Sequence, residues 1–126
     1  MKILVIDDEE FFAQTLTQLL GKSQSHEVTY VTSAKDALDI INRIKYDLII
    51  CDLRLPDDSN GGLIMKINTI IPEQEFFIIS AYEIPKHLRD NKELNIRAYF
   101  EKPFNVQDME VKINDLIFPK SKAASN

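Results

Sequence analysis

The chain has 126 residues, 44% of them hydrophobic, and a formal net charge of -5 at pH 7. That length fits one domain able to bury its own core, and the acidic balance argues against direct binding to nucleic acid or to an anionic membrane, since both are polyanions. The one cysteine, Cys51, cannot form an intrachain disulfide, and the N-terminal apolar run is too short for a signal peptide or a membrane span, so we expect a cytoplasmic protein.

Short apolar runs and amphipathic segments alternate along the sequence. A continuous apolar run indicates a strand covered on both faces, as in a parallel sheet, whereas apolar residues spaced three and four apart indicate a helix. The predicted strands are residues 2–6, 27–31, 47–52, 75–80 and 97–101. The predicted helices are residues 9–20, 34–44, 61–70, 85–94 and 106–118, the second of them capped by Ser33.

Five strands that alternate with five helices predict an α/β domain, in which a parallel sheet carries helices on both faces. We expect this domain to cover residues 1–118 and the polar residues 119–126 to form a tail or the start of a linker. In such open sheets, ligands bind at the carboxyl ends of the strands. The residues at those ends are therefore the candidates for function.

Polar residues follow four of the five predicted strands. Asp7 and Asp8 come directly after the first strand, and Asp52 ends the third. Ser80 ends the fourth strand, and Lys102 follows the fifth. Because the carboxyl ends of parallel strands share one edge of the sheet, we expect three carboxylates, a hydroxyl and an ammonium to meet there.

These groups predict phosphoryl chemistry. Three carboxylates in one cleft repel one another, and a single lysine offsets only part of that repulsion. A hard divalent cation with oxygen ligands, Mg²⁺, would offset the rest. An ionised aspartate beside such a metal can act as a nucleophile. An anionic phosphoryl group is its natural electrophile, since phosphoryl transfer depends mainly on positioning and charge neutralisation.

Four segments together resemble the receiver domain of two-component response regulators, over roughly residues 1–118. They are VIDDEE with the acidic pair, DLIICDLRLP with Asp52, FFIISA with Ser80, and YFEKPF with Lys102. The resemblance implies a single flavodoxin-like (βα)5 domain with strand order 2-1-3-4-5. It also implies a phosphorelay switch, which catalyses only its own phosphoryl transfer and autodephosphorylation, rather than an enzyme.

By this resemblance, Asp52 accepts a phosphoryl group from a histidine kinase or a phosphotransfer protein. Mg²⁺ is ligated directly by Asp8, Asp52 and the backbone carbonyl of Arg54, whereas Asp7 acts through water. These roles are what the family implies for the matching positions of this sequence.

The resemblance also implies a conformational switch. Lys102 pairs with the phosphoryl oxygens, aimed by a cis peptide bond to Pro103. Ser80 moves toward the phosphate, and Tyr99 turns inward into the space released. This movement would reshape the surface of the fourth helix, fifth strand and fifth helix, where a partner or a second copy of the chain would dock.

Two features modify the family pattern. The segment from Leu53 to Leu63 is longer than in the family pattern, so the sequence does not fix the residue at which the third helix begins. Arg54 and Tyr82 each stand two residues beyond a site residue, at positions that tune the phosphate lifetime in the family. We hypothesise that they shield the acyl phosphate from water and slow its hydrolysis.

Two other functions are compatible with parts of the pattern. A haloacid-dehalogenase-like phosphatase also uses a strand-end aspartate, Mg²⁺, a hydroxyl and a lysine, but it needs a second aspartate where this chain has Arg54. A phosphorylation-independent adaptor could keep the fold alone, although the complete set of acids, hydroxyl and lysine argues against it. Taken singly, the residues also have plainer roles: Asp7 and Asp8 as helix N-terminal charges, and Lys102 as a solvated lysine.

Overall fold

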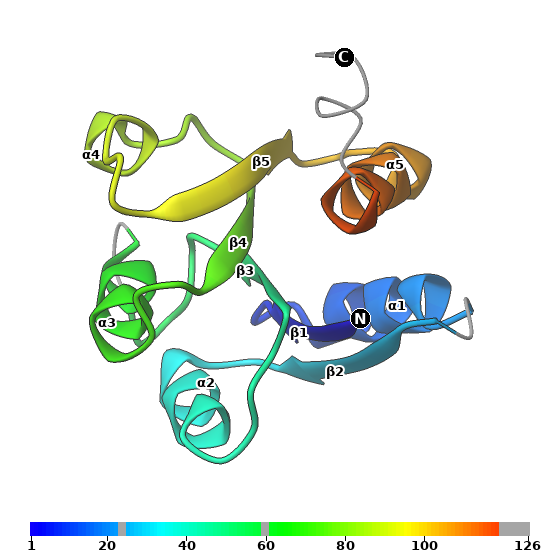
Figure 1. Cartoon of the computed structure of the whole chain (residues 1–126), viewed down its shortest axis with the longest axis horizontal. Helices are drawn as coiled ribbons and strands as arrows, with labels where there is room; N and C mark the ends of the chain where they lie inside the picture. Colours follow the sequence, from blue (N-terminus) through cyan, green and yellow to red (C-terminus); the bar gives the residue numbers. More distant parts are fainter. Residues whose placement is uncertain (23–24, 59–60, 119–126) are drawn as a thin grey trace.

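A sheet of five parallel strands, in the order β2-β1-β3-β4-β5, forms the middle layer of the molecule (Figure 1). The computed structural model describes residues 1–22, 25–58 and 61–118. The strands are β1 (Lys2–Ile6), β2 (Glu27–Val31), β3 (Leu48–Asp52), β4 (Glu75–Ser80) and β5 (Asn95–Glu101). The helices are α1 (Glu10–Leu20), α2 (Ala34–Ile41), α3 (Gly62–Ile70), α4 (Lys86–Arg89) and α5 (Val106–Ile117). The predicted α/β class and strand order are thus confirmed.

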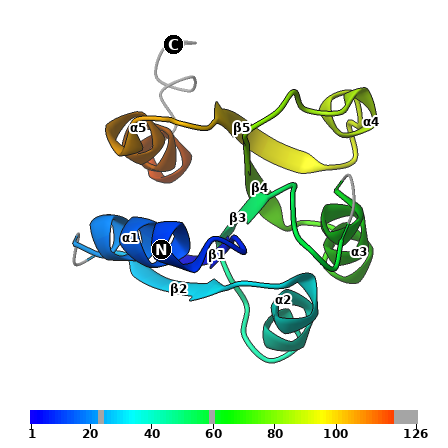
Figure 2. The ribbon, with the colours of Figure 1, turned by 180° about the vertical axis from the view of Figure 1, so that it is seen from behind.

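The strands divide their side chains between two layers of the core. In β1, Leu4 and Ile6 face a cluster that includes residues of α2, α3 and α4, whereas Ile3 and Val5 face a cluster that includes residues of α1 and α5. The two groups of helices lie on opposite sides of the sheet in Figure 1, and the view from behind in Figure 2 shows the same division. Burial on both faces explains why the central strands are continuous apolar runs.

The fourth helix is shorter than predicted. It spans Lys86–Arg89 rather than residues 85–94. Beyond it, the side-chain oxygen of Asn91 accepts a hydrogen bond from the Glu93 amide at 3.0 Å. Such side-chain bonds compete with the backbone bonds of a helix. Within α4 the buried residue is Leu88, so packing gives little support to a longer helix.

Two other boundaries differ from the prediction by two residues or more. The second helix ends at Ile41 rather than at residue 44, and Ile44 is 37% exposed. Tyr46 packs into the core beyond the end of this helix instead. The fifth strand begins at Asn95 rather than at residue 97. Neither change alters the carboxyl ends of the strands.

The loop between β3 and α3 is tied to the two helices beside it. The Asp57 carboxylate accepts hydrogen bonds from the amides of Ala34 (2.9 Å) and Lys35 (3.0 Å) at the start of α2. Asp58 accepts one from the amide of Leu63 in α3 at 3.0 Å. These bonds satisfy amides that the first turn of a helix leaves unpaired, and they anchor the longer loop next to the end of β3.

Three remaining expectations concern the cap of α2, the chain end and the membrane. The Asp36 amide donates to Ser33 Oγ at 3.1 Å, which confirms the predicted N-cap.

Residues 59–60 of the longer loop and the predicted tail, residues 119–126, lie outside the described part of the chain. Among the described residues, every helix is too short or too polar to cross a membrane.

Candidate functional site

Side chains from four strand ends gather at the carboxyl edge of the sheet. Asp7 follows β1, Asp52 ends β3 and Ser80 ends β4, and all three are buried. Lys102 follows β5, and its amide donates to the Ser80 carbonyl at 2.7 Å. Asp8, next to Asp7, is exposed. The structure therefore places the predicted acids, hydroxyl and lysine at one end of the sheet.

The Lys102 ammonium lies at the centre of this edge. Its Nζ donates to Asp7 Oδ2 at 2.8 Å, to Glu9 Oε1 at 2.8 Å and to Asp52 Oδ2 at 3.0 Å. The Phe12 ring lies on another side of the ammonium, with its centroid 4.4 Å from Nζ, in a cation–π contact. One positive charge thus faces three carboxylates, which leaves negative charge in excess.

Burial makes that excess charge unfavourable, above all at Asp7. Burial raises the pKa of the Asp7 carboxyl to about 6, against the lowering effect of its hydrogen bond from Lys102, and the charge of Asp52 adds to the increase. For Lys102, burial opposes the charged form, but the hydrogen bonds to the three carboxylates outweigh it and raise the pKa. The lysine therefore stays charged, and the carboxylates still lack a full counter-charge.

The donor set at this edge fits a magnesium ion. Asp7, Asp8 and Asp52 each offer a carboxylate oxygen, and these oxygens lie within 4.8 Å of one another. Backbone amides orient two of these groups: Glu9 N donates to Asp7 Oδ1 and Arg54 N donates to Asp52 Oδ1, both at 2.9 Å. Ligands that are all oxygen favour a hard cation, and a partly open set suits Mg²⁺, which keeps several of its waters.

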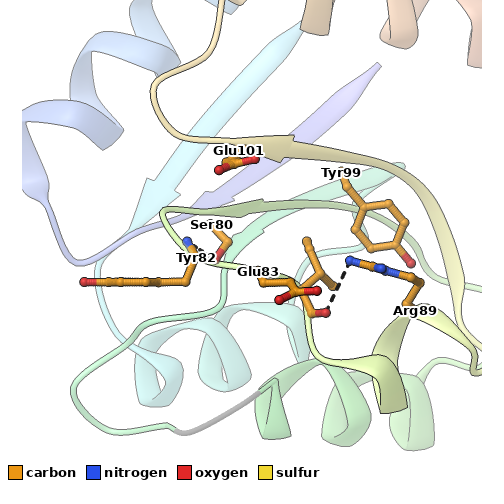
Figure 3. Close-up of a pocket in the computed structure, with 7 residues that line it drawn as sticks. Ser80, Tyr82, Glu83, Arg89, Tyr99 and Glu101 are labelled. Atoms are coloured by element: carbon orange, nitrogen blue, oxygen red, sulfur yellow. Dashed lines mark hydrogen bonds between the residues drawn. The ribbon is translucent and has the colours of Figure 1, made fainter.

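Ser80 also lines a cavity of about 450 Å³ on the β5 side of the site (Figure 3). Tyr99 forms part of its wall, is 40% exposed and directs its hydroxyl toward Arg89 in Figure 3. Ser80 Oγ accepts a hydrogen bond from the Tyr82 amide at 3.1 Å. The structure thus has an outward Tyr99 and a space beside Ser80.

Arg54 and Tyr82 stack on each other at the surface. The guanidinium carbon of Arg54 lies 4.1 Å from the centroid of the Tyr82 ring, in the range of a cation–π contact. Both residues are exposed. The pair therefore forms an outer contact between the loops that follow Asp52 and Ser80.

Two residues adjoin the site in sequence. The Lys102–Pro103 peptide bond is cis. Cys51 is buried, and its thiol donates to the Asp52 carbonyl oxygen at 3.2 Å. Burial, followed by the charge of Asp52, raises the pKa of the Cys51 thiol. The thiol therefore stays protonated, and we assign Cys51 to packing.

Glu9 and Phe12 contact the site, although the sequence did not predict this role for them. Both residues belong to the predicted helix 9–20, and both contact Lys102. Glu9 is the N-cap of α1 and Phe12 lies in its first turn, so the three-residue spacing puts them on one side of the helix start. Their three-residue spacing just after the acidic pair was the sequence feature that could have indicated these contacts.

Comparison with known proteins agrees with this geometry. A family model for the response regulator receiver domain matches residues 3–114, so the chain belongs to the receiver domain family. The chain is 24% identical over 108 residues to sporulation initiation phosphotransferase F of Bacillus subtilis, covering 86% of both chains. It is 29% identical over 117 residues to the two-component response regulator PhoP of Pseudomonas aeruginosa, covering 93% of this chain and 52% of PhoP. It thus spans about half the length of that relative.

Solved receiver structures share the fold. The response regulator receiver domain protein of Clostridium thermocellum is 29% identical, with a TM-score of 0.77 over 97% of this chain and 98% of that one. The response regulator TrrA of Thermotoga maritima, solved in complex with Mg(2+)-BeF, is 25% identical, with a TM-score of 0.76 over 91% of this chain and 97% of that one.

Family membership defines the class of function. The chain is a receiver domain of two-component response regulators, which is a signalling domain. The haloacid-dehalogenase and adaptor alternatives are not favoured. Receiver domains bind Mg²⁺ at an acidic pocket and interact with histidine kinases or phosphotransfer proteins.

Proposed function

We propose that Asp52 is the phosphoryl acceptor of this receiver domain and that a histidine kinase or a phosphotransfer protein is the donor. The observation that carries this proposal is the position of the Asp52 carboxylate. It is buried at the end of β3, lies 3.0 Å from the Lys102 ammonium and belongs to the group of three acids that could hold a metal ion. A nucleophile, a cation and a metal-ligand set therefore share one edge of the sheet.

In the proposed reaction, a carboxylate oxygen of Asp52 attacks the phosphorus, and the bond from phosphorus to the donor atom breaks. The Arg54 amide holds Oδ1 of Asp52 at 2.9 Å and thereby orients the carboxylate. After the transfer, the Lys102 ammonium pairs with the oxygens of the phosphoryl group. Positioning and charge neutralisation are the main requirements of this step.

Magnesium would be held by Asp8, Asp52 and the backbone carbonyl of Arg54, with Asp7 acting through water. When bound, the ion would neutralise negative charge on the phosphoryl oxygens. Asp7 supports this proposal, since its burial and raised pKa leave a carboxylate that gains from a nearby cation.

Ser80 and Tyr99 are the proposed switch. On phosphorylation, the Ser80 hydroxyl would turn from the Tyr82 amide and donate to a phosphoryl oxygen, and Tyr99 would rotate into the cavity that both residues line. The surface of α4, β5 and α5 would change shape and dock a downstream partner or a second copy of the chain. A few charge-assisted hydrogen bonds are enough to bias such a two-state element.

We further propose that residues 1–118 form the receiver and that residues 119–126 form a tail or the start of a linker. The net charge of -5 supports a domain that binds neither nucleic acid nor membrane directly. We propose that it acts in the cytoplasm, where response regulators typically act. The proposed domain turns over no substrate other than its own phosphoryl group.

Beryllofluoride, which imitates a phosphoryl group on an aspartate, tests the proposal. Addition of Mg²⁺ and beryllofluoride should shift the backbone NMR signals of Ser80, Tyr99 and Lys102 in the wild type, and it should leave those of Asp52→Ala in place. Equal shifts in both proteins would refute Asp52 as the acceptor.

A further inference from the structure

The three carboxylates around Lys102 take up all of its hydrogen-bonding capacity. Asp7, Glu9 and Asp52 each accept one bond from the ammonium, at 2.8, 2.8 and 3.0 Å. An ammonium has three N–H donors and accepts none, and the Phe12 ring lies on a further side. Phosphorylation turns the Asp52 carboxylate into the acyl phosphate, so one phosphoryl oxygen takes over its bond to Lys102. A second phosphoryl oxygen on Lys102 must displace Asp7 or Glu9.

Glu9 is the carboxylate that yields most readily. The side chains of Asp7 and Asp52 are 0% and 5% exposed, whereas that of Glu9 is 65% exposed. The first two also accept a backbone amide, from Glu9 and Arg54 respectively. An exposed ion pair has little strength, and water can replace Lys102 at the Glu9 carboxylate.

Glu9 is held in position from both sides along the chain. Its amide donates to Asp7 Oδ1 at 2.9 Å, and its carbonyl accepts the first backbone bond of α1, from the Ala13 amide at 2.9 Å. Within the described residues, the acids grouped as a possible metal site are Asp7, Asp8 and Asp52, so Glu9 stands outside that set. Its contact is with the lysine.

We propose that Glu9 is a positioning residue that holds Lys102 in its unphosphorylated arrangement and competes with the phosphoryl group for the lysine. This inference rests on the proposed role of Asp52 as acceptor. Each phosphorylation exchanges the Glu9–Lys102 pair for a phosphoryl–Lys102 pair, and no covalent bond to Glu9 forms or breaks. Glu9 thereby sets how readily the domain is phosphorylated.

Glu9→Gln removes the charge of the competitor and keeps its size. We expect this variant to bind beryllofluoride about two- to five-fold more tightly and to be phosphorylated by acetyl phosphate faster by a similar factor, which is the range that an exposed ion pair allows. Glu10→Gln is the matched control. Glu10 is the next residue, is exposed and carries the same charge, whereas the Lys102 bonds go to Asp7, Glu9 and Asp52.

The experiment titrates beryllofluoride in the presence of Mg²⁺ into wild type, Glu9→Gln and Glu10→Gln, and it repeats the first two in a Lys102→Gln background. A tighter Glu9→Gln beside an unchanged Glu10→Gln, with the gain lost in the Lys102→Gln background, supports the proposal. Equal affinities of the two single variants, weaker binding by Glu9→Gln, or a gain that persists without Lys102 would each overturn it. The comparison with Glu10→Gln decides the proposal by itself.

Failure of the proposed function gives a different result. If wild type incorporates no phosphate from acetyl phosphate, or if Asp52→Ala incorporates as much, the acceptor assignment is wrong. If wild type is phosphorylated at Asp52 and Glu9→Gln reacts at the wild-type rate, the acceptor assignment stands and the role of Glu9 is wrong.

Discussion

The acidic edge and the surface around α4 both adjoin Ser80 at the end of β4, but they are built in opposite ways. At the acidic edge, Asp7 and Asp52 are buried at the ends of paired strands, and one lysine joins their side chains. The α4 region is a single short helix, Lys86–Arg89, which is fixed by Leu88 and walls a cavity of about 450 Å³ through Arg89.

The difference separates two tasks. Phosphoryl transfer requires groups that are already in position before the reaction, and the buried strand ends provide them. A surface that reports phosphorylation must change shape, and such elements come from the parts of a fold with few buried contacts. The α4 region has this character, and it adjoins the two residues proposed as the switch, Ser80 and Tyr99.

Leu88→Ala is the strongest test of how α4 is held. Leu88 is fully buried, and a Cβ added at Gly61 would overlap its Cδ1, so it packs directly on the start of α3. We expect a loss of about 2–4 kcal/mol in the free energy of unfolding, measured in urea, as for other large-to-small core substitutions. Lys86→Ala, at an exposed position of the same helix, should change it by at most about 0.5 kcal/mol. A loss below about 1 kcal/mol for Leu88→Ala would contradict a role as the anchor.

Asp7→Asn tests whether a buried carboxylate at the acidic edge destabilises the folded protein. The pKa of Asp7 is about 6 in the folded protein against 3.8 as its ordinary value, so the folded state binds this proton more tightly. The stability that this bound proton contributes is therefore fully present below about pH 4 and is lost as the pH rises through 6. One pKa unit corresponds to about 1.4 kcal/mol, so the ionised carboxyl opposes folding by up to about 3 kcal/mol.

Without Mg²⁺, Asp7→Asn should therefore be more stable than wild type at pH 7.5, by about 1–3 kcal/mol, since the loss of the Lys102 bond offsets part of the gain. This difference should shrink as the pH falls to 4. Unfolding curves across that range measure it, and Asp8→Asn, at an exposed position, is the control. A variant that is less stable at every pH would contradict the account of the buried charge.

Gly61→Ala tests the connection between the two regions. Gly61 has φ of 80° and precedes α3, on the loop that leads from Asp52. A residue with a side chain is unfavourable at this positive φ, and we expect the free energy of unfolding to fall by about 1–2 kcal/mol. The added Cβ would also contact Leu88. In a double-mutant cycle, Gly61→Ala combined with Leu88→Ala should lose less than the sum of the two single losses, because the smaller residue 88 relieves the contact. Additive losses would show that the two residues do not press on each other.

The smallest expected effect concerns the Arg54–Tyr82 stack. We expect phosphate to be lost from Arg54→Ala and from Tyr82→Ala about two- to five-fold faster than from wild type, the range that an exposed cation–π contact supports. The decay of phosphoprotein after removal of acetyl phosphate measures this rate. Lys86→Ala, which leaves the stack intact, should decay at the wild-type rate. Unchanged lifetimes in both stack variants would end the shielding hypothesis.

The acidic edge was predictable from sequence because hydrophobic burial determines it. Continuous apolar runs located the central strands, and parallel pairing then brings their carboxyl ends together wherever the helices lie. Asp7, Asp52, Ser80 and Lys102 followed from that rule, and the family resemblance added the strand order.

The α4 region could not be predicted in the same way. Residues 85–94 have a polar composition that a helix tolerates, and the side chain of Asn91 ends the helix through a local bond to the Glu93 amide. The contacts of Glu9 and Phe12 with Lys102 join residues at least ninety positions apart. Such contacts depend on side-chain reach across the finished sheet, and the hydrophobic pattern carries no information about that reach.

One measurement tests the central claim most directly: mass spectrometry of the intact protein after incubation with acetyl phosphate and Mg²⁺, followed by mapping of the modified peptide. We expect one phosphate per wild-type chain, located on Asp52, and none on Asp52→Ala or on wild type treated with a magnesium chelator. A phosphate on another residue, or equal incorporation by Asp52→Ala, would contradict it.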